Sequence, residues 1–399
     1  MPQKLAYHSG FRSQSKRPYN KRPQGKSRQP RKEYIHSSKF IQKAKPRTED
    51  VYASQHSFQD FGLVSLINNN LRTMGFSSPS PIQDQAIPHG LVGKDIVGIA
   101  NTGTGKTAAF AIPVLHRLIN EPAAKAVIIA PTRELAEQIE QQCRMIAKNS
   151  GLDGALLIGG MSMGPQLSDL RYNPSIIIGT PGRIKDHIER GSLDISDCNI
   201  VVLDEVDRML DMGFVHDITR ILNQTSHSRQ SFYFSATLDA RVRNIIESFS
   251  RDPIYISVKS GDTSDNVNQD IVTFSSGENK LDKLHDILIR SDTTKTLIFD
   301  DTHRSVEKLS NELAERGFLT DSIHGGKSQF QRQLALKKFK NNQVTVLVAT
   351  DVAARGLDVS DISHVINYAL PQSYDDYVHR IGRTGRAGKV GFAFTFIER

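Results

Sequence analysis

Cysteine is scarce in this chain, with only Cys143 and Cys198 among its 399 residues. Two cysteines in helix-like and pre-strand contexts predict reduced, structural thiols, and not a disulfide framework or a metal site. Long apolar runs are also missing, because no stretch of about 18 consecutive apolar residues occurs, and the N-terminal residues lack an apolar signal-peptide core. We therefore expect no membrane span, no export signal and a cytoplasmic protein.

Acidic residues are scarce near the N-terminus. Residues 1–50 contain 14 Lys and Arg against three acidic residues, a net charge of +11, whereas the remaining residues carry 37 basic and 40 acidic side chains, a net charge of −3. This segment is rich in Pro, Ser and Gln and poor in aliphatic residues, so residues 1–56 are predicted to form a disordered basic tail. Its charge suits a phosphate backbone. A solubilising tail is the main alternative, and an organellar presequence is a weaker one.

Four larger side chains, Tyr34, Ile35, Phe40 and Ile41, interrupt the polarity of this tail. Apolar and aromatic residues in a polar segment need a surface to cover them. We hypothesise that they dock either on the folded body of the protein or on a protein partner.

Beyond the tail, short apolar runs alternate with amphipathic stretches. This alternation predicts βα units that form parallel sheets covered by helices on both faces. The predicted strands are 95–100, 127–130, 176–179, 200–203 and 232–234 in one half, and 296–299, 344–348, 364–367 and 391–396 in the other. A polar, breaker-rich stretch separates the halves. We therefore predict an α/β fold with a first domain over 57–258, a linker over 259–268 and a second domain over 269–399.

A glycine-rich sequence follows the first predicted strand and opens a helical pattern. Its candidate nucleotide-binding residues are Thr102, Gly103, Thr104, Gly105, Lys106 and Thr107. Backbone N–H groups of such a turn can surround phosphate oxygens, the lysine can neutralise the β and γ charges, and the Thr107 hydroxyl can bind Mg²⁺. This pattern predicts ATP as cofactor, together with Mg²⁺.

The predicted strand 200–203 leads directly into Asp204 and Glu205. An Asp at the end of a buried parallel strand holds Mg²⁺ in phosphate-loop enzymes, largely through water, and the adjacent Glu would polarise the attacking water. A solvated acidic strand end is the alternative for such a pair. Together with the phosphate loop, the pair predicts an ATP-hydrolysing enzyme.

Arginines cluster near the C-terminal end, in the sequence from His379 to Arg386. Two glycines hold these arginines close together, which suits a clamp on a γ-phosphate more than a solvated basic loop. Arginine fingers of this kind contribute about 10³ to 10⁵ in rate. Because Arg383 and Arg386 belong to the second predicted domain, hydrolysis would require the two domains to close.

These motifs, in this order, resemble the DEAD-box RNA helicases of superfamily 2 over residues 57 to about 396. The resemblance implies two tandem RecA-like domains. It also implies that Phe58 and Gln83 belong to the adenine-reading Q motif, that Asp358 binds the ribose, and that Arg383 and Arg386 are the fingers. Asp207, Ser235, Thr237 and His379 are implied to couple hydrolysis to strand separation.

The same resemblance implies sequence-independent RNA binding by residues of both domains. Arginine, threonine and glycine N–H groups contact phosphates and 2′-hydroxyls, and do not read base edges. The implied RNA-binding residues are Pro131, Thr132, Arg133, Gly160, Thr180, Arg183, Gln329, Arg332 and Thr350.

The chain departs from the usual family pattern in three places. Val206 replaces the alanine that gives the family its name, and we expect activity to survive because Asp204, Glu205 and Asp207 are kept. Ala369 stands where the family often has Asp. The chain ends soon after the predicted strand 391–396, so we expect the last helix of this domain to be absent or the sequence to be incomplete.

We therefore predict an ATP-dependent RNA helicase that acts as a monomer and unwinds short duplexes locally or remodels RNA–protein complexes. An ATP-dependent RNA clamp or assembly platform is the alternative of a different class. A DNA-directed helicase of the same superfamily is the other enzyme alternative.

Overall fold

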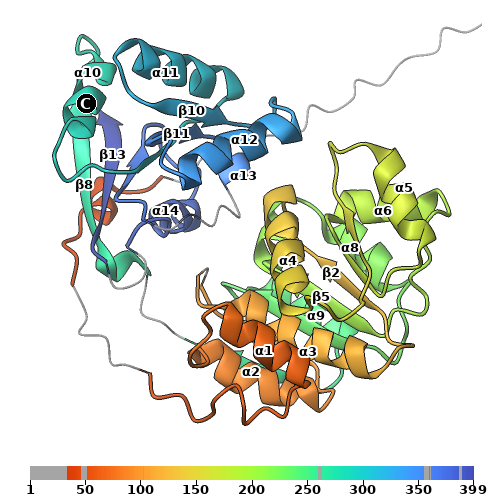
Figure 1. Cartoon of the computed structure of the whole chain (residues 1–399). Coiled ribbons are helices and arrows are strands. Elements are labelled where there is room, and N and C mark those ends of the chain that lie inside the picture. Colours follow the sequence, from red (N-terminus) through yellow and green to blue (C-terminus); the bar gives the residue numbers. More distant parts are fainter. Residues whose placement is uncertain are drawn as a thin grey trace, which may run out of the picture.

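Two parallel β-sheets organise the protein, one in each half of the sequence (Figure 1). The computed structural model describes residues 34–45, 52–101, 103–258, 263–354, 359, 361–385 and 389–399. Residues 52–258 are called the first unit below, and residues 263–399 the second unit. Within the described residues, no helix is long and apolar enough to cross a membrane.

The sheet of the first unit has seven strands in the order β3-β4-β2-β5-β6-β1-β7, and its neighbouring strands run parallel. Its strands are β1 (Ile96–Ile99), β2 (Ala126–Ile129), β3 (Gly154–Leu157), β4 (Ile176–Gly179), β5 (Ile200–Asp204), β6 (Gln230–Ser235) and β7 (Ile254–Ser257). Its helices are α1 (Ser65–Thr73), α2 (Pro81–Leu91), α3 (Lys106–Asn120), α4 (Arg133–Ile146), α5 (Met163–Arg171), α6 (Pro181–Glu189), α7 (Val206–Asp211), α8 (Val215–Leu222) and α9 (Ala240–Phe249).

Both faces of this sheet are buried. Ile200 and Val202 of β5 pack into the core formed with α1 to α4, whereas Val201 and Leu203 pack into the opposite core with α6 to α9. Alternate residues of a strand point to opposite faces, so a continuous apolar run is what a strand covered on both sides requires. This explains why the central strands have the strongest sequence signal.

The sheet of the second unit has six strands in the order β10-β11-β9-β12-β13-β8, again with parallel neighbours. Its strands are β8 (Val267–Phe274), β9 (Thr296–Phe299), β10 (Thr320–Ile323), β11 (Val346–Ala349), β12 (His364–Asn367) and β13 (Gly391–Glu398). Its helices are the short η2 (Thr263–Asn266), α10 (Lys280–Leu288), α11 (His303–Glu315), α12 (Gln329–Lys340), α13 (Asp351–Ala354) and α14 (Tyr374–Ile381). The predicted α/β class with two RecA-like parallel sheets is confirmed.

Each predicted strand overlaps an observed one, but four strands were not predicted. These are β3, β7, β8 and β10, and they are the edge strands of the two sheets. An edge strand is paired on one side only and lies nearer to solvent, so its sequence contains more polar residues. Thr320–Ile323, for example, has two polar residues that are half-buried and one, Ser322, that is buried.

Within the tail predicted for residues 1–56, the structure describes two stretches that contact the folded body. Residues 34–45 form η1 (Ser37–Phe40) and a short bridge to β8, with Phe40 only 1% exposed. Residues 52–56 are held by Asp84 of α2, whose carboxylate accepts hydrogen bonds from Tyr52, Gln55 and His56. Burial alone would raise the pKa of Asp84, but these hydrogen bonds outweigh it and the pKa lies below its usual value. Both stretches are ordered because they find binding partners on the folded body. Sequence composition alone does not reveal such partners.

Candidate functional site

The glycine-rich loop connects β1 to the N-terminus of α3. Gly103 and Gly105 have φ angles of 85° and 90°, in the left-handed region that glycine adopts at little cost. A Cβ at Gly105 would also collide with the carboxamide of Gln83, so this position needs glycine for space as well. Because α3 begins at Lys106, the positive end of its dipole faces the loop. The loop therefore has the geometry of an anion cradle.

Two side chains of α2 and its N-cap hold this loop. Gln83 donates from Nε2 to the carbonyl oxygen of Gly105 at 3.1 Å, and Ser80 donates from Oγ to that of Thr104 at 2.8 Å. Gln83 Oε1 accepts from the backbone N–H of Ser80, which completes a capping box. Phe58 is buried. Gln83 thus supports the loop in this structure, and its predicted contact with adenine remains a proposal.

Lys106 and Asp204 lie buried at the ends of neighbouring elements of this site. Nζ of Lys106 donates to the carbonyl oxygen of Ala100 at 2.9 Å. Burial raises the pKa of Asp204 to about 7; the charge of Lys106 opposes this rise and the charge of Glu205 adds to it. A carboxylate in this position gains from a nearby cation, which would favour its ionised form. Thr107 is half-buried in the first turn of α3.

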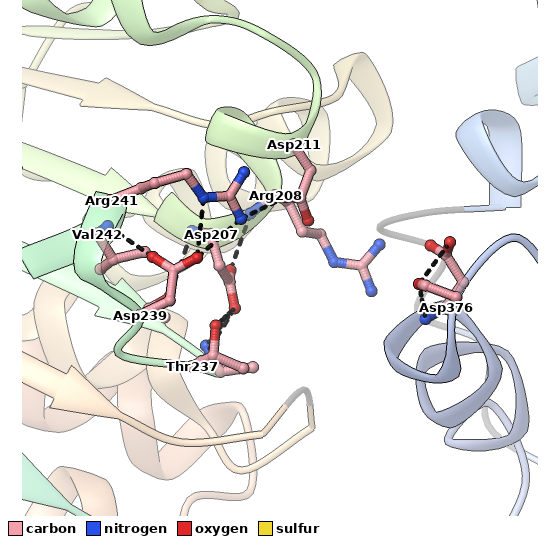
Figure 2. Close-up of polar contacts among 11 residues, drawn as sticks. Asp207, Arg208, Asp211, Thr237, Asp239, Arg241, Val242 and Asp376 are labelled. Atoms are coloured by element: carbon pink, nitrogen blue, oxygen red, sulfur yellow. Dashed lines mark hydrogen bonds and ion pairs between the residues drawn. The ribbon is translucent and has the colours of Figure 1, made fainter. Parts of the chain in front are cut away.

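Glu205 adopts a left-handed backbone conformation, with φ of 54°. This conformation is costly for a residue other than glycine and is found at functional sites where the surroundings enforce it. Oε2 of Glu205 is buried without a hydrogen bond and lies 3.3 Å from Nε of Arg208. In Figure 2, Arg208 extends from α7 across the cleft toward α14, where Asp376 lies.

Asp207 joins the acidic motif to the residues that follow β6 (Figure 2). Its Oδ2 accepts hydrogen bonds from the backbone N–H of Ala236, and from both the N–H and the hydroxyl of Thr237, at 3.0–3.1 Å. Its own N–H donates to Oγ of Ser235 at 3.3 Å. A carboxylate that accepts three hydrogen bonds fixes the ends of the two strands relative to each other.

Residues of both units line one cavity of about 280 Å³ at this site. The first unit contributes the phosphate loop and the acidic motif, and the second unit contributes one face of α14. The lining residues are Asn101, Lys106, Glu205, Asp207, Arg208, Ala236, Thr237, Tyr374, Asp375, Val378, His379 and Gly382. His379 of the second unit and Asp207 of the first unit therefore line the same cavity.

Arg383 lies just beyond α14 and is 4% exposed. It lines a smaller neighbouring cavity, together with Arg208 of the first unit, and not the larger one. Arg380, one turn earlier, forms a bidentate ion pair with Asp351 at 2.6 Å and donates to the backbone oxygen of Ala369. The backbone makes this last contact, so the replacement of the usual Asp by Ala369 leaves it intact. Arg380 thus anchors α14 to the sheet.

A second cavity, of about 520 Å³, also lies between the two units. Its lining residues include most of those that the sequence analysis assigned to RNA: Pro131, Thr132, Arg133, Thr180, Arg183 and Arg332, with Glu134, Gly159, Gly182, Asp186, Met212, Phe214, Gly325 and Val352. Thr350, near Val352, is buried and its hydroxyl has no hydrogen-bond partner. The structure thus brings together in one cavity six residues that the sequence analysis named separately.

Guanidinium groups gather on the wall of this second cavity. Arg133 packs against Gly159 and Gly160, and a Cβ at Gly160 would collide with it. Arg183 donates to the carbonyl oxygen of Met161 at 3.2 Å. Burial lowers the pKa of Arg133, and the positive charges of Arg332 and Arg183 lower it further. An anion would reduce the electrostatic repulsion between these cations. A nucleic-acid backbone supplies one phosphate anion at each nucleotide.

Gln329 and Arg332 contact the first unit directly. Nη2 of Arg332 lies 2.6 Å from Oε1 of Glu134. Nε2 of Gln329 donates to Glu137 at 3.2 Å, and Gln333 donates to the same carboxylate at 2.6 Å. Glu134 is thus the partner of Arg332 across the cleft. Three further residues of the predicted site, Thr102, Asp358 and Arg386, lie outside the described residues.

Comparison with known proteins gives a separate family match for each of the two units. The DEAD/DEAH box helicase family model matches residues 80–245, and that of the helicase conserved C-terminal domain matches residues 279–388. The DEAD-box ATP-dependent RNA helicase CshA of Bacillus subtilis is 44% identical over 343 residues, which are 86% of this chain and 69% of that protein. The chain belongs to the DEAD-box ATP-dependent RNA helicases.

Solved structures of DEAD-box proteins are similar over nearly the same range. Dbp5 of S. cerevisiae, bound to RNA and ADP BeF3, is 29% identical with a TM-score of 0.76, and the match covers 87% of this chain and 90% of that one. A DEAD box protein from Methanococcus jannaschii is 39% identical with a TM-score of 0.51, covering 86% and 93% of the two chains. The two-sheet architecture of this DEAD-box protein is therefore the one observed in its relatives.

The acidic motif of this DEAD-box protein fits a magnesium ion that is held mainly by phosphate and water. Among the described residues, no group of three or more His, Cys, Asp and Glu side chains could hold a metal by itself. Asp204 has a raised pKa, and Oε2 of Glu205 lacks a hydrogen bond. Mg²⁺ keeps several waters and usually takes only one or two carboxylates in phosphate sites. Asp204 and the hydroxyl of Thr107 are the residues that would hold it.

Several residues of the site were not singled out by sequence reasoning. Arg208, Glu137 and Arg380 acquire their importance from partners that are remote in sequence. Arg380 carried a usable signal, because it belongs to the arginine cluster that the sequence analysis identified. Glu137 carried none, because a glutamate on the polar side of a helix has no feature that distinguishes it from a solvated one.

Proposed function

We propose that this DEAD-box protein hydrolyses ATP with Mg²⁺ between its two units and uses the cycle to separate short RNA duplexes or to remodel RNA–protein complexes. One observation carries the proposal: the ATP-site cavity and the arginine-lined cavity are each lined by residues of both units. Closure of the units therefore assembles both sites at once. Binding at either site then favours binding at the other, and this coupling is reciprocal.

We assign the chemical steps to residues of this chain as follows. Bound Mg²⁺ would neutralise phosphate charge next to Asp204 and Thr107. Lys106 and the loop N–H groups bind the phosphates, and the carboxylate of Glu205 orients the attacking water and accepts its proton. Arg383 and Arg386 stabilise charge on the transferred phosphoryl group. Because both arginines belong to the second unit, hydrolysis depends on closure of the two units.

RNA binding is proposed to be independent of sequence. The groups assigned to RNA are guanidiniums, hydroxyls and backbone N–H groups, which contact phosphates and sugars, and not the base edges. A closed cleft that grips one strand through its backbone would displace the partner strand of a few base pairs. Hydrolysis then reopens the cleft, so unwinding is local and non-processive. Because one chain supplies both halves of each site, we propose that the protein acts as a monomer. We also propose that it acts in the cytoplasm.

An RNA clamp is the second candidate function. It is favoured by the contacts that Gln329, Arg332 and Gln333 make with the first unit, because such contacts would also hold closed units together. A clamp would release phosphate slowly and keep RNA bound for a long time. A helicase would release RNA after each hydrolysis.

The decisive experiment is the steady-state ATPase of the intact chain without nucleic acid, with single-stranded RNA and with DNA of matching sequence. Stimulation by RNA alone supports the proposal, and duplex unwinding is then measured. Equal stimulation by DNA would replace it with a DNA-directed or general helicase. RNA binding without stimulation would favour the clamp.

A further inference from the structure

The N-terminal segment of residues 34–45, called the arm here, is bound to the outer edge of the second sheet. Gln42 and Gln269 exchange backbone hydrogen bonds of 3.0 and 2.7 Å, so the arm adds one antiparallel bridge to the edge strand β8. The N–H of Ala44 donates to Oδ1 of Asn268 at 2.9 Å. An edge strand offers unpaired backbone groups, and here the chain's own N-terminal segment uses some of them.

Phe40 is the apolar anchor of the arm. It is 1% exposed and packs in a cluster with Val267, Tyr377, Ile381 and Ala393. Its ring lies 4.7 Å from that of Tyr377 in an edge-to-face arrangement. The hydroxyl of Tyr377 donates to the Gln269 side chain at 2.9 Å. A buried aromatic ring in an otherwise polar segment indicates a specific packing contact.

The surface that receives the arm is the back of α14. Tyr377 and Ile381 of this helix face Phe40, while Val378, His379 and Gly382 line the ATP-site cavity. Lys39 of the arm also places Nζ 4.8 Å above the ring of Tyr374, another residue that lines this cavity. The arm therefore supports, from behind, the helix that leads to Arg383.

The arm also contacts the first residues of the second unit. The N–H of Lys45 donates at 2.8 Å to the carbonyl oxygen of Asp265, which lies in η2 at the start of the second unit. Farther along the chain, Tyr52 and Gln55 are hydrogen bonded to Asp84 in the first unit. Seven Cα–Cα steps separate Lys45 from Tyr52, so these two anchors cannot lie more than about 25 Å apart.

We propose that the arm positions the second unit for catalysis: once docked, it gives the two units a second connection and supports α14 from behind. A single covalent connection leaves one unit free to rotate relative to the other, whereas two connections restrict the motion to a hinge and raise the effective concentration of one half-site for the other. The arm thereby lowers the amount of RNA needed for closure. This inference rests on the proposed function, because closure is measured through RNA-dependent hydrolysis.

Phe40 is a positioning residue in this scheme, and Phe40→Ala in the full chain tests it. The RNA concentration for half-maximal ATPase stimulation should rise at least threefold, while kcat at saturating RNA stays within about twofold of wild type, since RNA binding can still drive closure. Phe40→Leu should largely restore the wild-type value, and Tyr34→Ala, at a residue that is 88% exposed, should equal wild type. A fall in kcat with an unchanged RNA requirement would reduce Phe40 to a stability role and overturn the proposal.

An engineered disulfide between the arm and β8 tests whether docking of the arm, and not the stability of the fold, sets the RNA requirement. Gln42 and Gln269 form a hydrogen-bonded antiparallel pair, whose usual Cα separation of about 5.5 Å suits a disulfide. Gln42→Cys with Gln269→Cys is added to Phe40→Ala; Cys143 and Cys198 are buried and do not compete. Oxidation should return the RNA concentration for half-maximal stimulation to the value of the two-cysteine variant that keeps Phe40. Reduction should raise this concentration again. The same requirement in both redox states would overturn the proposal.

Hydrogen exchange distinguishes a failure of this proposal from a failure of the proposed function. In the full chain without ATP or RNA, Phe40→Ala should speed exchange in α14 and β8 and leave the central strands of the first sheet unchanged. That result does not depend on activity, so it stands even if wild-type ATPase is not stimulated by RNA. Unchanged exchange in α14 and β8 would show that the arm supports neither.

Discussion

Nη2 of Arg332 in the second unit lies 2.6 Å from Oε1 of Glu134 in the first unit, and both side chains are almost fully buried. Nε of Arg332 and the second carboxylate oxygen of Glu134 have no hydrogen-bond partner. A buried pair with unsatisfied atoms gives little net stability, but loss of one partner leaves an uncompensated charge. We therefore expect the pair to make closure selective for one arrangement of the two units.

Glu134→Gln tests the role of this pair. Arg332 would stay buried opposite a neutral amide, so closure should cost more and RNA-stimulated ATPase at subsaturating RNA should fall at least tenfold. RNA-free ATPase should stay unchanged. The control is Glu140→Gln, on the same helix, since Glu140 pairs with Arg144 inside the first unit. Equal RNA-stimulated rates for both variants would remove the pair from the closure step.

Glu205→Gln tests the assignment of the residue that orients water. The amide keeps the size of the side chain but cannot accept a proton, so ATP and RNA should still bind while turnover falls at least a hundredfold. Nucleotide binding by fluorescence and single-turnover hydrolysis separate these effects. Glu121→Gln, at an exposed residue that pairs with Arg117, is the control. Normal turnover of the Glu205 variant would contradict the catalytic role.

Val206→Ala restores the residue usual in the family. Val206 begins α7 and is fully buried in the core that the sheet forms with α6 to α9. The loss of two methyl groups should therefore destabilise the first unit by about 1–3 kcal/mol. ATPase should remain within about twofold of wild type, since the hydrogen bonds of Asp207 do not involve this side chain. Thermal melting and ATPase are the measurements, with Val92→Ala, at a residue 71% exposed, as control. An unchanged melting temperature would argue against tight packing at this position.

His364 makes the stability of the second unit depend on pH. Burial lowers the pKa of His364 to about 4, and it stacks on Phe392 and Phe394. The unfolded chain binds a proton near pH 6.5 and the folded chain does not, so stability falls as the pH drops from about 6.5 to about 4. The pH dependence of unfolding should be shallower in His364→Gln over this window. Parallel curves for the two proteins would show that His364 stays protonated after folding.

Deletion of residues 1–33 tests the basic tail while the arm is kept. The slope of log RNA affinity against log salt should decrease by about 0.7 for each lost single-strand phosphate contact. RNA-free ATPase should not change, because the residues that we assign to ATP binding and hydrolysis all lie within residues 58–386. An unchanged slope would favour the solubilising role.

The motifs with local sequence signals were predictable. A glycine-rich loop, an acidic strand end and continuous apolar strands each owe their pattern to neighbours in the chain or to burial on both faces of a sheet. Central strands such as β5 were found for this reason. The edge strands β3, β7, β8 and β10 were missed, because a strand near solvent has no such pattern.

The amino-acid sequence by itself determined the two-sheet α/β class, the phosphate loop and the family, because these depend on short-range spacing and on apolar periodicity. Only the tertiary structure decided which groups meet across the cleft. Arg332 meets Glu134, Arg208 extends toward α14 and Phe40 packs behind that helix. In each case the two partners lie more than a hundred positions apart in the sequence. Such contacts depend on how packed elements stack in space, and no local pattern of polarity records that.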